Sequence, residues 1–127
     1  MRRKYYKKNK EHILHLRKKN YAENESLRLR KRDKDLKKSY GIDIKQYNNI
    51  LKAQGNACGI CEAKENNNKR TKYFDVDHCH ESGQVRGLLC TNCNMGLGKF
   101  NHDIKWLIAA IKYLVRNYDY RIYETKK

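Results

Sequence analysis

The chain has 127 residues, of which 30 are Lys or Arg and 14 are Asp or Glu, so its formal net charge at pH 7 is +16. Only 39% of the residues are apolar, and no run approaches the roughly 18 apolar residues that a membrane span requires. The N-terminal residues also lack the apolar core of a signal peptide, so we expect neither a membrane protein nor a secreted one. So large a positive charge favours a polyanionic partner, and nucleic acid is the first candidate.

Residues 1–40 hold 16 of the basic residues and 5 acidic ones, which gives this segment a charge of +11 and leaves +5 for residues 41–127. The segment is rich in helix-forming residues, and the polar stretch 20–24 indicates a break between two helices. Its apolar residues form no continuous stripe, so it is either a solvated charged extension or a DNA-contacting arm. Its four tyrosines slightly favour contact with DNA. The expected contacts at its start are Arg2, Arg3, Lys4, Lys7 and Lys8.

A helix and a hairpin are predicted in the middle of the chain. Asp43 and Gln46 have the spacing of a capping box and Gly55 supplies a stop, which predicts a helix that ends at about Gln54. The β-prone segments 71–77 and 84–88 are separated by the turn residues 81–83, which is typical of a β-hairpin.

Two further helices are expected after the hairpin. A short one follows Cys90 and is predicted to end at Gly96-Leu97-Gly98. Asp103 then caps a longer helix, on which apolar residues recur every three or four positions from Ile104 to Tyr118. A stripe of this kind is typical of a helix face packed in the core.

Five cysteines and five histidines suggest a metal site. Cys58-x-x-Cys61 and Cys90-x-x-Cys93 are two matched pairs with 28 residues between them, which is typical of two turns that converge on one structural Zn²⁺. The alternatives are a redox motif or a pair of disulfides. Zinc is favoured because the chain has little apolar core and no signal peptide.

A second polar cluster, Asp77-His78-Cys79-His80, lies at the end of the first predicted strand. A carboxylate oxygen suits Mg²⁺, and a neutral imidazole beside it suits proton abstraction. These residues therefore indicate a catalytic metal site, and the competing interpretation is a second zinc site made by His78, Cys79 and His80.

These motifs, together with the run from Gly83 to Gly98, resemble the phage recombination endonuclease VII family of the HNH, or ββα-metal, nuclease superfamily. The resemblance covers about residues 41–115. It implies an α+β fold, in which a small zinc-stapled ββα-metal (HNH) unit is flanked by helices and preceded by the basic helical arm. It also implies a DNA endonuclease that uses one catalytic Mg²⁺ or Mn²⁺ and leaves 5′-phosphate and 3′-hydroxyl ends.

By position, the resemblance assigns four candidate catalytic residues: Asp77, His78, His80 and Asn94. Asp77 and Asn94 match the ligands of the catalytic metal. His78 matches the general base, and His80 matches the histidine that positions or polarises the scissile phosphate.

Three other residues complete the predicted site. Many relatives have Asp where this chain has Cys79, and we expect Cys79 to be structural or incidental rather than a metal ligand, because the zinc already has four thiolates. Arg86 and Lys99 are candidates for binding the flanking phosphates, and the alternative for each is a solvated surface charge.

We therefore expect a basic arm at residues 1–40, a nuclease domain at 41–120 and a tail at 121–127. The expected function is HNH-type cleavage of DNA, selective for branched substrates or weakly specific, in the cytoplasm of a phage host or other bacterium. The alternatives are a non-catalytic zinc-containing DNA-binding module and an RNA-binding zinc protein, both of which leave Asp77, His78 and Asn94 unexplained. A homodimer is left open, because the arm precedes the zinc motif here, unlike in the best-known family member.

Overall fold

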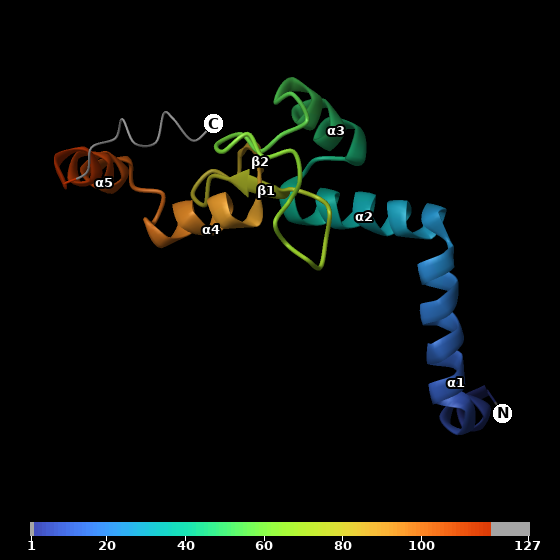
Figure 1. Ribbon diagram of the computed structural model, residues 1–127. Helices are drawn as coiled ribbons and strands as arrows, with labels where there is room; N and C mark the ends of the chain where they lie inside the picture. Colours follow the sequence, from blue (N-terminus) through green and yellow to red (C-terminus); the bar gives the residue numbers. More distant parts are fainter. Residues whose placement is uncertain (1, 118–127) are drawn as a thin grey trace.

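The computed structural model describes residues 2–117, in which five helices surround one two-stranded antiparallel sheet. The elements in chain order are α1 (Arg2–Glu23), α2 (Glu25–Tyr40), α3 (Ile44–Ala53), β1 (Asp75–His78), β2 (Val85–Leu89), α4 (Thr91–Lys99) and α5 (Ile104–Asn117). The hairpin lies at the centre, with α2 and α3 on one side and α4 on the other, while α1 and α5 extend to opposite ends (Figure 1). None of the helices in residues 2–117 is long and apolar enough to cross a membrane.

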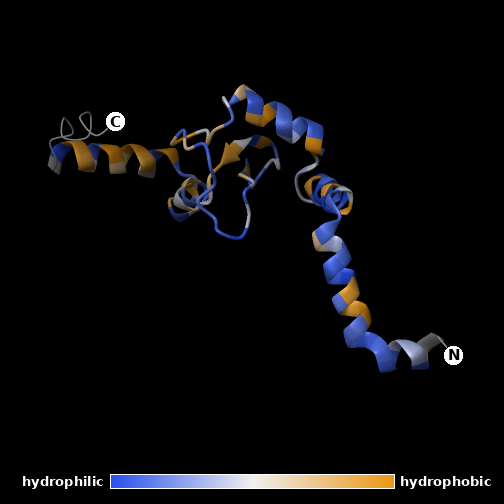
Figure 2. Ribbon diagram, turned by 45° about the vertical axis from the view of Figure 1, so that its right-hand side comes forward, coloured by the Kyte–Doolittle hydropathy of each residue, from blue (hydrophilic) through white to orange (hydrophobic). Residues whose placement is uncertain are grey.

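The basic N-terminal segment forms two helices, with the break at Asn24. The Asn24 side chain caps α2 by accepting a hydrogen bond of 3.1 Å from the Leu27 backbone N–H. The first helix is mostly hydrophilic (Figure 2), but α2 contributes the buried Leu36 to the core. Asp33 also accepts a hydrogen bond from the backbone N–H of Ile44 at 2.9 Å. Only the second half of the predicted arm is thus fixed to the core, and the domain boundary at residue 40 stays a prediction.

Helix α3 confirms the predicted capping box. The Asp43 side chain accepts from the Gln46 N–H at 2.8 Å, and the Gln46 side chain accepts from the Asp43 N–H at 2.8 Å. Tyr47 on this helix is 2% exposed and donates its hydroxyl hydrogen to the Phe74 carbonyl at 3.0 Å. The hydrogen bond joins α3 to the segment that enters β1.

Gln54, at the C-terminal end of α3, pairs with β2 as an additional strand residue would. Its amide donates to the Leu88 carbonyl at 2.8 Å and accepts from the Leu88 N–H at 2.9 Å. A Cβ at Gly87 would lie 2.8 Å from the Gln54 Oε1, so a larger residue there would displace the end of the Gln54 side chain. Gln54 therefore satisfies the backbone of Leu88 at the edge of β2 without a third strand.

The hairpin is present but its first strand is shorter than predicted, because β1 begins at Asp75 rather than at residue 71. Side chains satisfy the preceding carbonyls: Asn66 donates to that of Tyr73 at 2.6 Å, and Tyr47 to that of Phe74. In the partner strand, Asp75 pairs with Leu89, after which the chain turns into the cysteine motif. The ladder therefore has no partner for residues 71–74.

The predicted end of the short helix at Gly96-Leu97-Gly98 is wrong, since α4 continues to Lys99. A glycine costs a helix only about 1 kcal/mol relative to alanine, and Leu97 packs against the core between the two glycines. This packing keeps the last turn of α4 helical.

Helix α5 has the predicted cap but not the predicted burial. The Asp103 side chain accepts from the Lys105 N–H at 2.7 Å, yet the apolar stripe is exposed, with Ile104 at 71% and Ile111 at 61%. Asn101 and His102 have positive φ angles of 51° and 54°, and this turn directs α5 away from the hairpin. The expectation that this face lies in the core is therefore wrong for the described residues. Tyr118 lies outside them.

Candidate functional site

The two cysteine pairs converge as predicted. The four Sγ atoms of Cys58, Cys61, Cys90 and Cys93 all lie within 4.8 Å of one another. The Sγ atoms of Cys61 and Cys90 are 3.7 Å apart, close to the roughly 3.8 Å expected between sulfurs bound tetrahedrally to one zinc. This cluster of four soft donors could hold one zinc ion, and its turns join the entry to the hairpin with the start of α4.

Backbone geometry already favours a thiolate in this cluster. Burial alone would raise the pKa of the Cys58 thiol, but backbone N–H groups directed at its sulfur lower the pKa to about 6. The N–H of Cys90 is one of these donors, at 3.3 Å. Burial raises the pKa of the Cys93 thiol, which lies beside the other sulfurs. Four adjacent thiolates need a cation to remain charged together, which agrees with a metal site.

The fifth cysteine lies outside the cluster. Cys79 starts the hairpin turn, where its N–H donates to the Gln84 carbonyl at 2.8 Å. A hydrogen bond from Ser82 lowers the pKa of the Cys79 thiol. Within residues 2–117 no second group of three His, Cys, Asp or Glu side chains is arranged to hold a metal. The alternative of a zinc site at His78, Cys79 and His80 therefore does not form there.

Asp77 and Arg86 form a partly buried ion pair across the hairpin. Arg86 donates from Nε and Nη2 to the two carboxylate oxygens of Asp77, at 2.7 and 2.8 Å. The pairing register shifts here, since Asp77 lies opposite Gly87 and His78 lies opposite Val85. Arg86 is thus the extra residue of a β-bulge, a feature that redirects side chains next to active sites. The Asp77 side chain is 7% exposed and that of Arg86 is 40% exposed, so the carboxylate is fixed while the guanidinium still reaches solvent.

A row of aromatic rings continues from this pair. The ring of His78 lies 5.3 Å from that of Tyr40 and 5.0 Å from that of His80, which stacks on it. His80 in turn lies 4.8 Å from His102. Arg86 Nη2 is 2.9 Å from His102 Nδ1, and because a guanidinium only donates, His102 accepts at Nδ1. The predicted residues Asp77, His78, His80 and Arg86 thus lie in one contiguous site.

His102 and Tyr40 are members of this site that the sequence did not indicate. His102 belongs to no motif, and its position depends on the positive-φ turn before α5. A cavity of about 400 Å³ separates that turn from the hairpin end, and Cys79, His80, Arg86 and His102 contribute to its lining. Tyr40, the last residue of α2, joins the site to the N-terminal helices.

The remaining predicted residues lie on the helices around the hairpin. Asn94 is half-buried in the first turns of α4, which packs against β1. Lys99 is exposed at the other end of α4, and Lys4, Lys7 and Lys8 are exposed on α1. The side chains of Arg2 and Arg3 lie outside the described part of the structure.

Comparison with known proteins gives one family and two phage relatives. The family model for recombination endonuclease VII matches residues 33–116. A protein described as Gene 59 protein of Mycobacterium phage D29 is 43% identical over 77 residues, which are 60% of this chain and 45% of the relative. The Gene 59 protein of Mycobacterium phage L5 is 42% identical over 78 residues, covering 61% of this chain and 46% of the relative. The chain thus spans about half the length of the curated relatives it matches. No solved structure matches it significantly.

Proposed function

The chain belongs to the recombination endonuclease VII family, and on this basis we propose that it is an HNH-type endodeoxyribonuclease that hydrolyses DNA phosphodiester bonds with one divalent cation. The observation that carries the proposal is the site at the turn end of the hairpin, where Asp77, fixed by Arg86, lies next to a row of histidine rings. In this proposal β1, β2 and α4 form the ββα-metal unit and the cysteine cluster binds the structural zinc. A DNA-binding protein without catalysis has no need of this arrangement.

Asp77 and Asn94 would hold the catalytic Mg²⁺ or Mn²⁺. One carboxylate and one amide oxygen are hard donors that suit these ions, and α4 carries Asn94 alongside β1. Arg86 donates one hydrogen bond to each carboxylate oxygen of Asp77. Each oxygen has a second lone pair that could bind the ion, so the oxygens of Asp77 and Asn94 fit Mg²⁺ or Mn²⁺. When bound, the ion would stabilise negative charge on the phosphate and on the leaving oxygen.

His78 is proposed as the general base that takes a proton from the attacking water. Its ring lies between those of Tyr40 and His80, and these contacts limit its rotation. His80 is proposed to position the scissile phosphate. The exposed part of the Arg86 guanidinium and Lys99 are proposed to contact flanking phosphates, and residues 1–40 to act as a DNA-binding arm ahead of a nuclease domain at 41–120.

Cleavage of supercoiled plasmid tests this function. We expect nicking with Mg²⁺ and none with EDTA. Asp77→Asn and Asn94→Ala should raise the Mg²⁺ concentration for half-maximal cleavage at least about tenfold, because each removes or weakens an oxygen ligand. Asn92→Ala, at an exposed position on the same helix, is the control and should leave the titration unchanged. Gel retardation without nicking would instead support the non-catalytic DNA-binding module, and an unchanged titration would remove the altered residue from the ligand set.

The substrate is proposed to be branched DNA, or duplex DNA cut with weak sequence preference, in the cytoplasm of a bacterium or phage host. The proposed contacts are cations on exposed surfaces, and phosphate contacts carry no sequence information. Rates on a four-way junction, a flap, a mismatch and a linear duplex at one salt concentration would measure this selectivity. Equal rates on all four would argue against branch selectivity.

We also propose that the protein forms a homodimer through α5. The exposed apolar side chains of this helix include Ile104, Ile108, Ile111 and Leu114, and an apolar stripe of this extent normally has a partner. Light scattering coupled to size-exclusion chromatography should give twice the monomer mass. The double variant Ile108→Glu/Ile111→Glu should give the monomer mass, while Lys105→Glu/Lys112→Glu controls for added negative charge on the same helix. A monomeric wild-type protein at micromolar concentration would contradict the proposal.

A further inference from the structure

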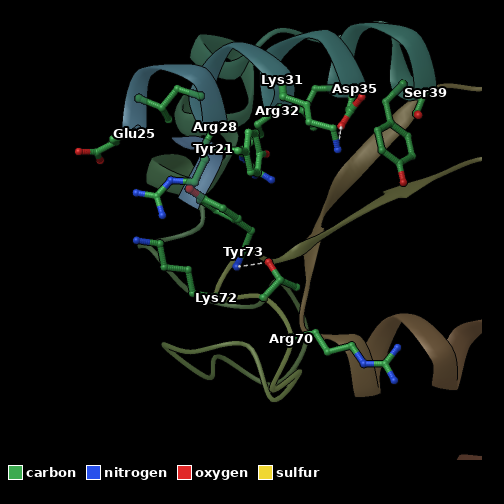
Figure 3. Close-up of a pocket in the computed structure, with 14 residues that line it drawn as sticks. Tyr21, Glu25, Arg28, Lys31, Arg32, Asp35, Ser39, Arg70, Lys72 and Tyr73 are labelled. Carbon is green, nitrogen blue, oxygen red and sulfur yellow. Dashed lines mark hydrogen bonds and ion pairs between the residues drawn. The ribbon is translucent and has the colours of Figure 1, made fainter. Parts of the chain in front are cut away.

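A groove of about 600 Å³ lies between α2 and the loop that precedes β1 (Figure 3). We call it the α2 groove. Its charged lining consists of five cationic and two acidic side chains: Arg28, Lys31, Arg32, Arg70, Lys72, Glu25 and Asp35. The cations come from both walls, since Arg28 descends from α2 and Lys72 belongs to the loop opposite (Figure 3). The groove is therefore positively charged across its width.

One residue of this lining, Arg32, has no ionic partner within residues 2–117. The Arg32 side chain is inserted between two aromatic rings, with its guanidinium carbon 3.6 Å from the centre of the Tyr73 ring and 4.4 Å from that of Tyr47. Its Nε and Nη2 are buried and have no hydrogen-bond partner in the described part of the chain. Among residues 2–117, no carboxylate forms an ion pair with it. Because two of its buried nitrogens lack a hydrogen-bond partner in this part of the chain, the guanidinium is stabilised further when an anion lies above it.

The groove ends beside the candidate active site. Tyr40 lines it, and the Tyr40 ring is also the neighbour of His78 at 5.3 Å. Tyr40 is therefore shared by the active site and the groove. The active site and the groove share one wall, which is the C-terminal part of α2.

We propose that the α2 groove binds the sugar-phosphate backbone of the DNA strand that is cut, on one side of the scissile phosphate. This inference rests on the proposed function as a DNA endonuclease. Arg28, Arg70 and Lys72 are exposed and form no ion pair within the described residues, so they contact phosphates directly. Lys31 is paired with Asp35 at 3.6 Å and contributes less. Arg32 acts from below through its charge and by fixing Tyr73 in the opposite wall.

The test is the salt dependence of DNA binding for two matched double variants. Arg70→Ala/Lys72→Ala removes two charges from the groove, and Lys45→Ala/Lys52→Ala removes two exposed charges from α3, which does not line it. A fluorescently labelled four-way junction is titrated by anisotropy in EDTA at several KCl concentrations. The slope of log affinity against log salt concentration is negative, and each lost phosphate contact reduces its magnitude by about 0.9. We expect the groove variant to lose between about one and two units of slope and at least about tenfold in affinity at low salt, and the α3 variant to keep both.

Further measurements keep the result interpretable. Zinc content and thermal unfolding are recorded for each variant, and Arg28→Ala, from the opposite wall, is expected to lower the slope by about 0.9 on its own. The inference is overturned if the groove variants keep the wild-type slope or if the α3 variant loses as much. Binding in EDTA does not require cleavage. Wild-type protein that binds through the groove but never cuts with Mg²⁺ therefore refutes the nuclease function alone, whereas cleavage with an uninvolved groove refutes this inference alone.

Discussion

Replacing His78 with alanine is expected to slow DNA cleavage by about 10²- to 10⁴-fold, which is the usual contribution of a general base. His78 ends β1 directly after Asp77, and its ring is positioned by Tyr40 and His80. The side chain is half-buried and is not part of the hydrophobic core, so its loss should leave the fold intact. The rate should be measured under single-turnover conditions at saturating DNA with Mg²⁺, so that weaker binding does not contribute.

The control is Asn49→Ala, which removes an exposed polar side chain from α3, outside both the proposed DNA-binding arm and the candidate site. It should cut at the wild-type rate, and both variants should keep the wild-type zinc content and affinity for DNA in EDTA. If His78→Ala cuts as fast as the control, the general base is a different group. His80 and His102 would then be the next residues to replace, because their rings continue the same row.

Local sequence patterns predicted the parts of this protein that depend on short-range rules. The capping box of Asp43 and Gln46, the cap at Asp103 and the turn between the strands each involve residues only a few positions apart, and all three are present. The convergence of the two cysteine pairs was also predictable, because one tetrahedral ion admits few arrangements of two Cys-x-x-Cys turns.

Features that depend on tertiary packing were not predictable in the same way. The sequence suggested separate roles for Asp77 and Arg86, but a β-bulge turns Arg86 onto the carboxylate. The sequence did not indicate that His102 belongs to the site, because its position depends on a turn with positive φ angles that no sequence motif marks. For α5, the apolar periodicity correctly indicated an amphipathic helix but could not indicate whether its partner belongs to the same chain. Apolar periodicity shows that one face of a helix favours burial, but only the three-dimensional structure shows which surface covers that face.

The cysteine cluster should be as important to the fold as His78 is to cleavage. The core is small, and Cys58 and Cys90 are themselves among its buried residues. Structural zinc contributes about 10–16 kcal/mol in zinc-finger peptides, which equals or exceeds the roughly 5–15 kcal/mol that stabilises a typical domain. Cys61 is exposed and lies outside the core, so Cys61→Ser removes a ligand without leaving a cavity. We expect this variant to lose its zinc and its cooperative thermal transition.

Cys79→Ser provides the matched control, because it makes the same chemical change at the cysteine outside the cluster. It should retain one zinc per chain by elemental analysis and melt within a few degrees of the wild type by near-ultraviolet circular dichroism. A Cys61→Ser protein with full zinc and an unchanged transition would show that the fold does not need the fourth thiolate. The turn at Cys58–Cys61 is joined to β2 by a hydrogen bond from the Gly59 N–H to the Leu88 carbonyl at 3.0 Å, so loss of the proposed zinc should abolish cleavage together with the folded hairpin. His78→Ala should slow cleavage without loss of zinc or of the fold, so the two variants separate the proposed structural metal from the proposed catalytic site.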